Sequence, residues 1–150
     1  MLIGNKIELL DNFRKICRKH KLRVTPQRVL IYEEVINSKD HPSADVLYKR
    51  IIERCPEVSF DTVYRTLAKF ASIGLIEQID GFGTSMRFDP MIGQHFHFRC
   101  RQCGNIIDFE AQCYENLAIP DEIAERHEVT KLQVTLEGIC SECIKKSAGG

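Results

Sequence analysis

Two pairs of cysteines have the most specific spacing in the sequence. Cys100 and Cys103 form one Cys-x-x-Cys pair, and Cys140 and Cys143 form a second pair after 36 intervening residues. Each pair spans a turn that directs two sulfur atoms to one point, and four thiolates complete the tetrahedral coordination of Zn²⁺. We therefore expect a closed, structural zinc site whose binding energy contributes to folding. The rival interpretations are reduced pairs without metal and a redox pair, although the thioredoxin-like helix start that a redox pair needs is not evident.

A second group of residues combines histidines with carboxylates. In the segment His95-Phe96-His97-Phe98 a strand would place both imidazoles on one face and both phenyl rings on the other. Asp89 precedes this segment and Asp108 follows it among apolar neighbours. Nitrogen and oxygen donors of this kind suit Fe²⁺ or Mn²⁺. Surface histidines beside solvated aspartates explain the pattern equally well, and His41 by spacing alone is an exposed loop residue.

Composition limits the possible classes of protein. The chain has 150 residues, 21 basic and 21 acidic side chains and 43% apolar residues, which excludes a disordered chain and a general polyanion binder. The first 30 residues carry eight basic and two acidic side chains, which is compatible with one nucleic-acid-binding face. Because no membrane-length apolar run or signal peptide is evident, we expect a cytoplasmic protein with no membrane contact. In that reducing compartment the remaining cysteines would be ordinary thiols: Cys17, Cys55 and Cys113.

The elements that position these residues differ between the two halves of the chain. Apolar periodicity predicts helices near 7–20, 25–36, 43–52 and 59–73, the last three with capping hydroxyls at Thr25, Ser43 and Ser59. In the fourth helix we expect Thr62, Arg65, Thr66 and Lys69 to face outward. A hairpin follows over 75–88 with its turn at 80–83. Helices followed by a small hairpin are typical of a winged helix-turn-helix module, although outward polar residues also occur on helices that are only solvated.

The second half has a strand pattern over 95–99, 105–110 and 131–139, with a helical segment at 112–127 that Pro120 interrupts. About 60 residues are marginal for an independent core, so this half needs a metal, a partner subunit, or both. We therefore predict an α+β fold. Residues 1–88 would form a winged helix-turn-helix DNA-binding domain, and residues 89–150 a small α/β dimerisation domain with a three-stranded antiparallel sheet.

Several motifs together resemble one known family. They occur in the same order over about residues 7–144: Thr25-Pro26-Gln27-Arg28, His41-Pro42-Ser43-Ala44-Asp45, Thr62-Val63-Tyr64-Arg65-Thr66-Leu67, Arg87-Phe88-Asp89, His95-Phe96-His97 and both cysteine pairs. This pattern is similar to that of the ferric uptake regulator family. The resemblance implies a homodimeric bacterial transcription repressor, not an enzyme, that binds a palindromic operator in double-stranded DNA when metal sets the geometry of its domains.

The resemblance also assigns roles to residues. It gives structural Zn²⁺ to Cys100, Cys103, Cys140 and Cys143, and regulatory Fe²⁺ or Mn²⁺ to His41, Asp89, His95, His97 and Asp108. A winged helix of this kind would contact DNA through Tyr64 and Arg65, flanked by Thr62 and Lys69, with Arg23 and Arg28 near phosphates.

Two branches of the family differ in their metal sites. Asp108 resembles the peroxide-responsive branch, in which iron-dependent oxidation of a ligand histidine, here His41 or His95, releases the repressor. Gln94, Phe96 and Leu132 stand where a further metal site would have ligands in other members, so that site looks missing. The segment Tyr64-Arg65-Thr66-Leu67 is instead more similar to the iron-uptake branch. Iron-responsive or zinc-responsive repression is therefore the alternative within the family, and a metal-dependent hydrolase or zinc redox protein is the alternative outside it.

Overall fold

The computed structural model describes residues 2–79, 85–90 and 95–149. The chain divides into two compact units, residues 1–92 and 93–150. The turn predicted at 80–83 and residue Gln94 lie outside the described residues. Among the described helices, none is long and apolar enough to cross a membrane. Helices and strands occur in both units, which confirms an α+β fold.

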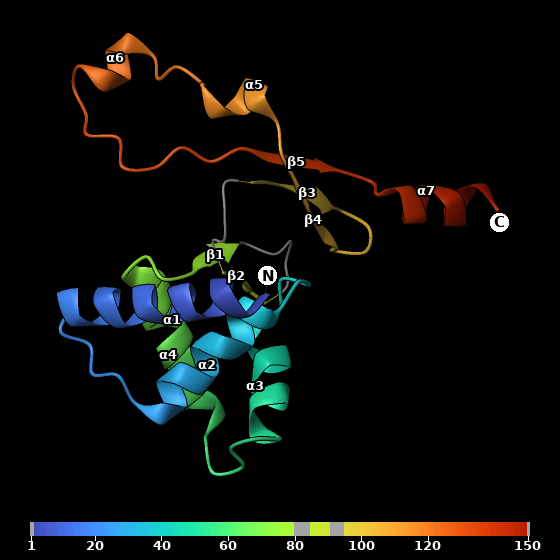
Figure 1. The fold of residues 1–150 in the computed structure, drawn as a ribbon. Coiled ribbons are helices and arrows are strands. Elements are labelled where there is room, and N and C mark those ends of the chain that lie inside the picture. Colours follow the sequence, from blue (N-terminus) through green and yellow to red (C-terminus); the bar gives the residue numbers. More distant parts are fainter. Residues whose placement is uncertain (1, 80–84, 91–94, 150) are drawn as a thin grey trace. The chain divides into compact units, whose positions relative to one another are not determined.

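The first unit consists mainly of four helices, as the periodicity predicts (Figure 1). They are α1 (Leu2–Lys19), α2 (Pro26–Asn37), α3 (Ala44–Ile52) and α4 (Phe60–Ser72). The hydroxyls of Thr25, Ser43 and Ser59 each accept a hydrogen bond from a backbone N–H in the first turn of the next helix. All three predicted N-caps are confirmed, because these hydroxyls satisfy donors that a helix start leaves without a partner.

Three aromatic side chains form the centre of the first unit's core. Phe13 of α1 stacks on Tyr32 of α2 with ring centroids 4.7 Å apart, and Phe70 of α4 meets both rings edge-on. Val63 and Leu67, on the inner face of α4, are also fully buried. Thr66 was expected to face outward but is buried, because it lies three residues after Val63 and four before Phe70 on the same face of the helix.

A short antiparallel hairpin follows α4. Gly74 ends the helix with φ +77°, and β1 (Glu77–Ile79) then pairs with β2 (Arg87–Asp89). Strand β2 also holds the loop that precedes α3, because Phe88 donates its backbone N–H to the carbonyl of Pro42 at 3.0 Å. Residues before α3 and at the end of the hairpin are thus joined within one unit.

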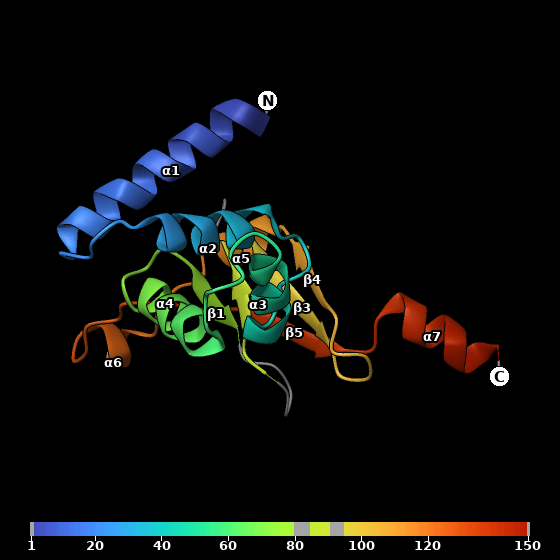
Figure 2. The same ribbon diagram turned by 90° about the horizontal axis from the view of Figure 1, so that it is seen from below.

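The second unit contains a three-stranded sheet with short helices (Figure 2). Its elements are β3 (Phe96–Cys100), β4 (Ile106–Phe109), α5 (Gln112–Glu115), α6 (Asp121–Ala124), β5 (Thr135–Gly138) and α7 (Ser141–Ala148). The helix predicted over 112–127 is reduced to α5 and α6. Neither begins with a side-chain cap, and Pro120 separates them, so the chain there does not sustain one amphipathic helix.

The prediction of an antiparallel sheet is wrong, because the sheet is mixed. Strand β3 lies in the middle, with β4 antiparallel to it and β5 parallel. The chain leaves β4 at the end of the sheet where β3 begins, and after α5 and α6 it enters β5 from that same end. Hydrophobic alternation indicates a strand but contains no information about its direction.

Candidate metal centres

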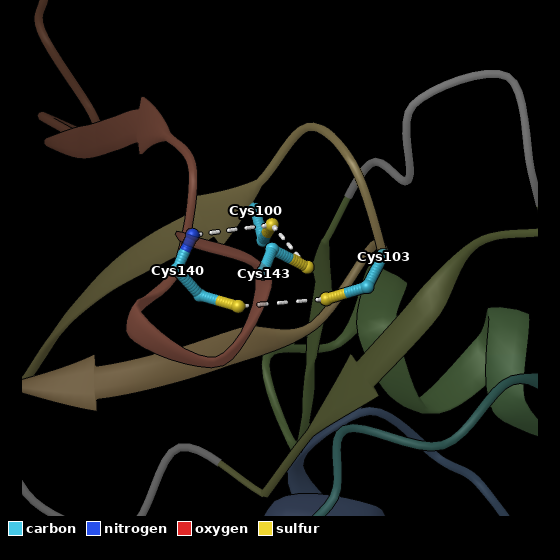
Figure 3. A group of neighbouring side chains, drawn as sticks. All are labelled: Cys100, Cys103, Cys140 and Cys143. Carbon is cyan, nitrogen blue, oxygen red and sulfur yellow. Dashed lines mark hydrogen bonds between the residues drawn. The ribbon is translucent and has the colours of Figure 1, made fainter. Parts of the chain in front are cut away.

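The four cysteines of the two pairs come together at one end of the second unit's sheet (Figure 3). Their sulfur atoms all lie within 4.8 Å of one another. The Sγ atoms of Cys100 and Cys143 are 3.9 Å apart, and those of Cys103 and Cys140 are 3.8 Å apart. Zinc–sulfur bonds of about 2.3 Å in a regular tetrahedron separate sulfur atoms by about 3.8 Å. The four sulfurs therefore have the spacing and chemistry of a tetrahedral zinc site.

The parallel pairing of β3 and β5 produces this convergence. Cys100 at the end of β3 is in register with Gly138 at the end of β5, so Cys140 follows two residues later at the same end of the sheet. The Phe98 ring lies against Gly138, where an added Cβ would come within 3.3 Å of it. After Cys103 the chain turns at Gly104 with φ +73°, which agrees with the freedom expected of glycine there. An antiparallel β5 would carry the second pair to the opposite end.

The second pair lies at a helix start that sequence analysis did not predict. Cys140 is the N-terminal flanking residue of α7, and Cys143 lies in its first turn. Each sulfur nevertheless meets one from the other pair, since Cys103 lies beside Cys140 and Cys100 beside Cys143. This cross-pairing favours a four-ligand site over a redox disulfide within one pair.

Backbone donors act on the buried sulfur of Cys100. The N–H of Cys140 donates to Cys100 Sγ at 3.3 Å. Backbone hydrogen bonds from Cys103 and Cys140 lower the pKa of Cys100 to about 6, whereas burial raises the pKa of Cys143 to about 12. One thiolate is thus stabilised by the backbone, and full deprotonation of the cluster requires a cation among the sulfurs.

A set of nitrogen and oxygen donors lies on the β3–β4 hairpin of the second unit. His97 and Asp108 are directly opposite in the register of the two strands. The Nε2 atom of His97 lies 3.3 Å from an Asp108 oxygen, and Nε2 of His95 lies 3.8 Å from the same oxygen. The two imidazole rings meet edge-on with centroids 4.9 Å apart. Three of the predicted regulatory ligands are therefore brought together within this unit.

The other side chains of the strand confirm the predicted alternation. Phe96 lies between the two histidines in sequence and packs with Phe109 and Tyr114 at centroid distances of 5.8 and 5.5 Å. One face of the hairpin therefore carries the imidazoles while Phe96 joins an aromatic cluster. This packing restricts the strand and helps fix the direction of the imidazoles.

The first unit holds the other two predicted ligands side by side. His41 Nε2 lies 3.0 Å from an Asp89 carboxylate oxygen, and both side chains are buried. Spacing alone predicted an exposed loop histidine, which is wrong, because β2 holds the His41 loop and presents Asp89 beside it. Buried carboxylates require a partner, and a histidine together with a carboxylate is a donor pair for a divalent cation.

Residues around His41 form contacts that sequence analysis missed. Asp40 pairs with Arg50 of α3, and Arg87 of β2 donates to the backbone carbonyl of His41 at 3.1 Å. The hydrogen bond from Arg50 lowers the pKa of Asp40. In the sequence, the position of Asp40 next to a candidate ligand could have indicated a role near the site. Its partner Arg50 lies ten residues away and is revealed only by the fold.

The predicted DNA contacts lie in the first unit. Tyr64, Arg65 and Lys69 are exposed on α4, and Thr62 is half-buried in its first turn, where its backbone N–H donates to Ser59. The Arg65 guanidinium pairs with Asp61 at 3.0 Å. Arg23 lies before α2 and is exposed, and the Arg28 guanidinium donates to the backbone carbonyl of Arg23.

A model of the ferric uptake regulator family matches residues 19–138 of the chain. The chain belongs to this family. The peroxide operon regulator of Bacillus subtilis is 36% identical over 128 residues, which cover 83% of this chain and 86% of that protein. Among solved structures, the Campylobacter jejuni peroxide stress regulator is similar with a TM-score of 0.65 and 29% identity, covering 86% of this chain and 97% of the other. The ferric uptake regulator of Pseudomonas aeruginosa with manganese has a TM-score of 0.69 and 27% identity, covering 85% and 97%.

Substitution of a single cysteine tests the proposed zinc site. Replacing Cys103 by serine should remove bound zinc and lower the unfolding temperature, because a hydroxyl is a poor substitute for a thiolate ligand. The exposed Cys113 lies outside the four-sulfur cluster, so Cys113→Ser is the matched control and should retain zinc. Elemental analysis of the purified proteins measures the zinc. Equal zinc content in both variants would contradict the assignment.

Proposed function

We propose that this protein is a homodimeric, metal-dependent transcription repressor that binds a palindromic operator. The observation that carries the proposal is the distribution of the nitrogen and oxygen donors over the chain. His41 and Asp89 stand together in the first unit, and His95, His97 and Asp108 stand together in the second. A single ion bound by both groups restrains one unit against the other, which is what a metal-dependent DNA-binding switch requires.

The two metals have different roles in this proposal. Zn²⁺ held by Cys100, Cys103, Cys140 and Cys143 is structural, because four thiolates leave no open position. Fe²⁺ or Mn²⁺ suits the five nitrogen and oxygen donors, which form a harder ligand set. Binding of the regulatory ion shifts the population of dimers toward the form that fits two half-sites. The free energy of this shift is limited by the difference in metal-binding free energy between the two forms.

Exposed apolar side chains in the second unit support its role in dimerisation. Leu132 and Ile144 are 55% and 57% exposed, and Leu136 and Ile139 are also exposed. One cluster of buried apolar side chains in this unit comprises three cysteines, with Phe98 packed against them, and Ile106 is also buried. A second copy of the chain covering these side chains would supply the hydrophobic burial that a unit of this size lacks.

The helices and hairpin of the first unit support DNA binding as a winged helix-turn-helix, with α4 as the recognition helix. Tyr64 and Arg65 stand on the exposed face of α4, where arginine can bind guanine through two hydrogen bonds. The Arg65–Asp61 pair is exposed by 79% and 69%, so it is worth only about 0.3–0.5 kcal/mol and separates easily when DNA competes.

Arg65 and Lys69 should respond differently to substitution. Arg65→Ala should reduce the preference for operator over random DNA, by about 1–3 kcal/mol in discrimination, because a base contact is lost. Lys69→Ala should weaken binding to both DNAs and reduce the salt dependence, because a phosphate contact is lost. Fluorescence anisotropy with Mn²⁺-loaded protein, at several salt concentrations and with a metal-free control, measures both effects.

Metal-independent binding of the wild-type protein would contradict the proposed repressor. Equal losses on specific and random DNA for both variants would contradict the assignment of Arg65 to base recognition and leave the metal dependence intact.

Hydrogen peroxide is the proposed signal. Asp108 and the similarity to peroxide regulators of other bacteria support this branch. His41, Asp89, His95, His97 and Asp108 would hold Fe²⁺, which would supply the redox chemistry that cleaves the O–O bond of hydrogen peroxide. In the net reaction one peroxide oxygen would enter a ring C–H bond of His41 or His95 and the other would leave as water. The oxidised imidazole would then be a poorer ligand for the ion. The buried position of His41 beside Asp89 keeps this imidazole among the donors rather than in bulk solvent.

Peptide mass spectrometry tests the proposed sensing chemistry. Protein loaded anaerobically with Fe²⁺ and exposed to dilute hydrogen peroxide should show one added oxygen atom on the peptide containing His41 or His95. Mn²⁺-loaded protein treated in the same way should stay unmodified, because Mn²⁺ does not drive this oxidation. Unmodified histidines in protein that demonstrably holds iron would exclude peroxide sensing and favour an iron-responsive or zinc-responsive repressor.

A further inference from the structure

The loop that carries His41 has a constrained backbone. His41 has φ +46°, in the left-handed region that residues with a side chain seldom adopt. No glycine stands in the segment Ser38-Lys39-Asp40-His41-Pro42, and Pro42 further restricts the residue before it. Such a conformation persists only where surrounding contacts impose it.

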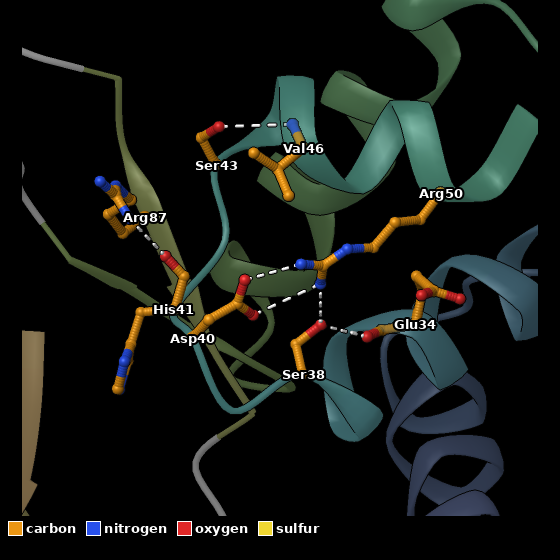
Figure 4. A network of polar contacts seen from close by, with 8 residues as sticks. All are labelled: Glu34, Ser38, Asp40, His41, Ser43, Val46, Arg50 and Arg87. Carbon is orange, nitrogen blue, oxygen red and sulfur yellow. Dashed lines mark hydrogen bonds and ion pairs between the residues drawn. The ribbon is translucent and has the colours of Figure 1, made fainter. Parts of the chain in front are cut away.

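One set of contacts ties this loop to α3 (Figure 4). The Arg50 guanidinium donates to both Asp40 carboxylate oxygens, at 2.6 and 3.3 Å. The same guanidinium donates to Ser38 Oγ at 3.0 Å, and Ser38 Oγ donates to the backbone carbonyl of Glu34 at 2.7 Å. One side chain of α3 therefore connects the end of α2 with the residue that immediately precedes His41.

A second set of contacts ties the loop to β2. Arg87 donates to the His41 carbonyl at 3.1 Å, and the Phe88 N–H donates to the Pro42 carbonyl at 3.0 Å. The loop is thus held on both sides of His41, and Asp89, the neighbouring donor, lies on the same strand. In Figure 4 the imidazole points away from the Arg50–Asp40 pair, so these contacts act on the backbone of the loop and not on the ring.

We propose that Asp40 and Arg50 form a positioning clamp that holds His41 in the geometry required by the regulatory ion. This inference rests on the proposed function, because it concerns the same ion. Arg50 belongs to α3. Leu47 of α3 and Leu67 of α4 are buried in the same core. The clamp therefore also connects the position of His41 with α4, the helix proposed to contact DNA. Arginine suits this position because its planar fork donates to the two carboxylate oxygens through two nitrogens and also reaches Ser38, whereas lysine has a single nitrogen.

The test compares Mn²⁺ affinity in zinc-loaded, full-length dimers. Arg50→Lys and Asp40→Asn should each weaken Mn²⁺ binding about 10- to 100-fold, the range found when residues that orient metal ligands are replaced. The double variant should be no weaker than the more affected single variant, because both substitutions remove one interaction. Isothermal titration with Mn²⁺ measures the affinity, and zinc content together with the unfolding temperature shows that each protein is folded.

Arg54→Lys is the matched control. Arg54 also pairs with carboxylates, those of Glu33 and Glu34 at 3.6 and 3.9 Å, but its ion pairs lie outside the His41 loop. This variant should bind Mn²⁺ as the wild type does. An equal loss in Arg54→Lys would overturn the clamp in favour of a general loss of stability.

His41→Ala separates failure of the clamp from failure of the proposed function. If His41→Ala loses Mn²⁺ affinity while Arg50→Lys and Asp40→Asn retain it, the clamp is wrong and the regulatory site stands. If His41→Ala binds Mn²⁺ as the wild type does, the regulatory site and the clamp both fail. Asp40→Asn preserves the shape of the side chain, so it decides the outcome if Arg50→Lys does not fold.

Discussion

Convergence of two Cys-x-x-Cys turns at one end of a small sheet is the constraint on which the second unit depends. The buried apolar residues described there are Ile106 and a cluster of Cys100, Cys140 and Cys143 against which Phe98 packs. A hydrophobic core of this size cannot offset the conformational entropy of ordering nearly 60 residues. In the proposed zinc site, metal–sulfur bonds would supply the stabilisation that hydrophobic burial does not, and would order the hairpin that presents His95, His97 and Asp108. Direct pairing of β3 with β5 links the two sites physically.

The first unit is stabilised by the usual packing of amphipathic helices. Its core is centred on Phe13, Tyr32 and Phe70, and the helix starts are capped. This stable framework tolerates a locally unfavourable feature, the left-handed backbone of His41, because contacts from α3 and β2 over-determine the loop. The two units would therefore position their proposed ligands by different means, the second unit by a sheet joined to the cysteine cluster and the first by a loop held from two sides.

The sequence predicted the features that depend on neighbouring residues. Caps at Thr25, Ser43 and Ser59 and the alternation of His95 to Phe98 follow from local chemistry, and the structure confirms them. Features that depend on distant pairing were missed. The direction of β5, the burial of His41 and the partner of Asp40 are settled by tertiary contacts that periodicity does not contain. Membership of the ferric uptake regulator family was predicted because its motifs extend along most of the chain.

We propose that one regulatory ion takes ligands from both units. Titration of zinc-loaded protein with Mn²⁺ tests this proposal, using Asp89→Asn in the first unit, His97→Ala in the second, and the double variant. We expect one regulatory site per chain and a large loss of affinity in each single variant. The total loss of binding free energy in the double variant should be smaller than the sum of the two single losses. Wild-type affinity in either single variant would show that only one unit holds the ion and would contradict shared binding.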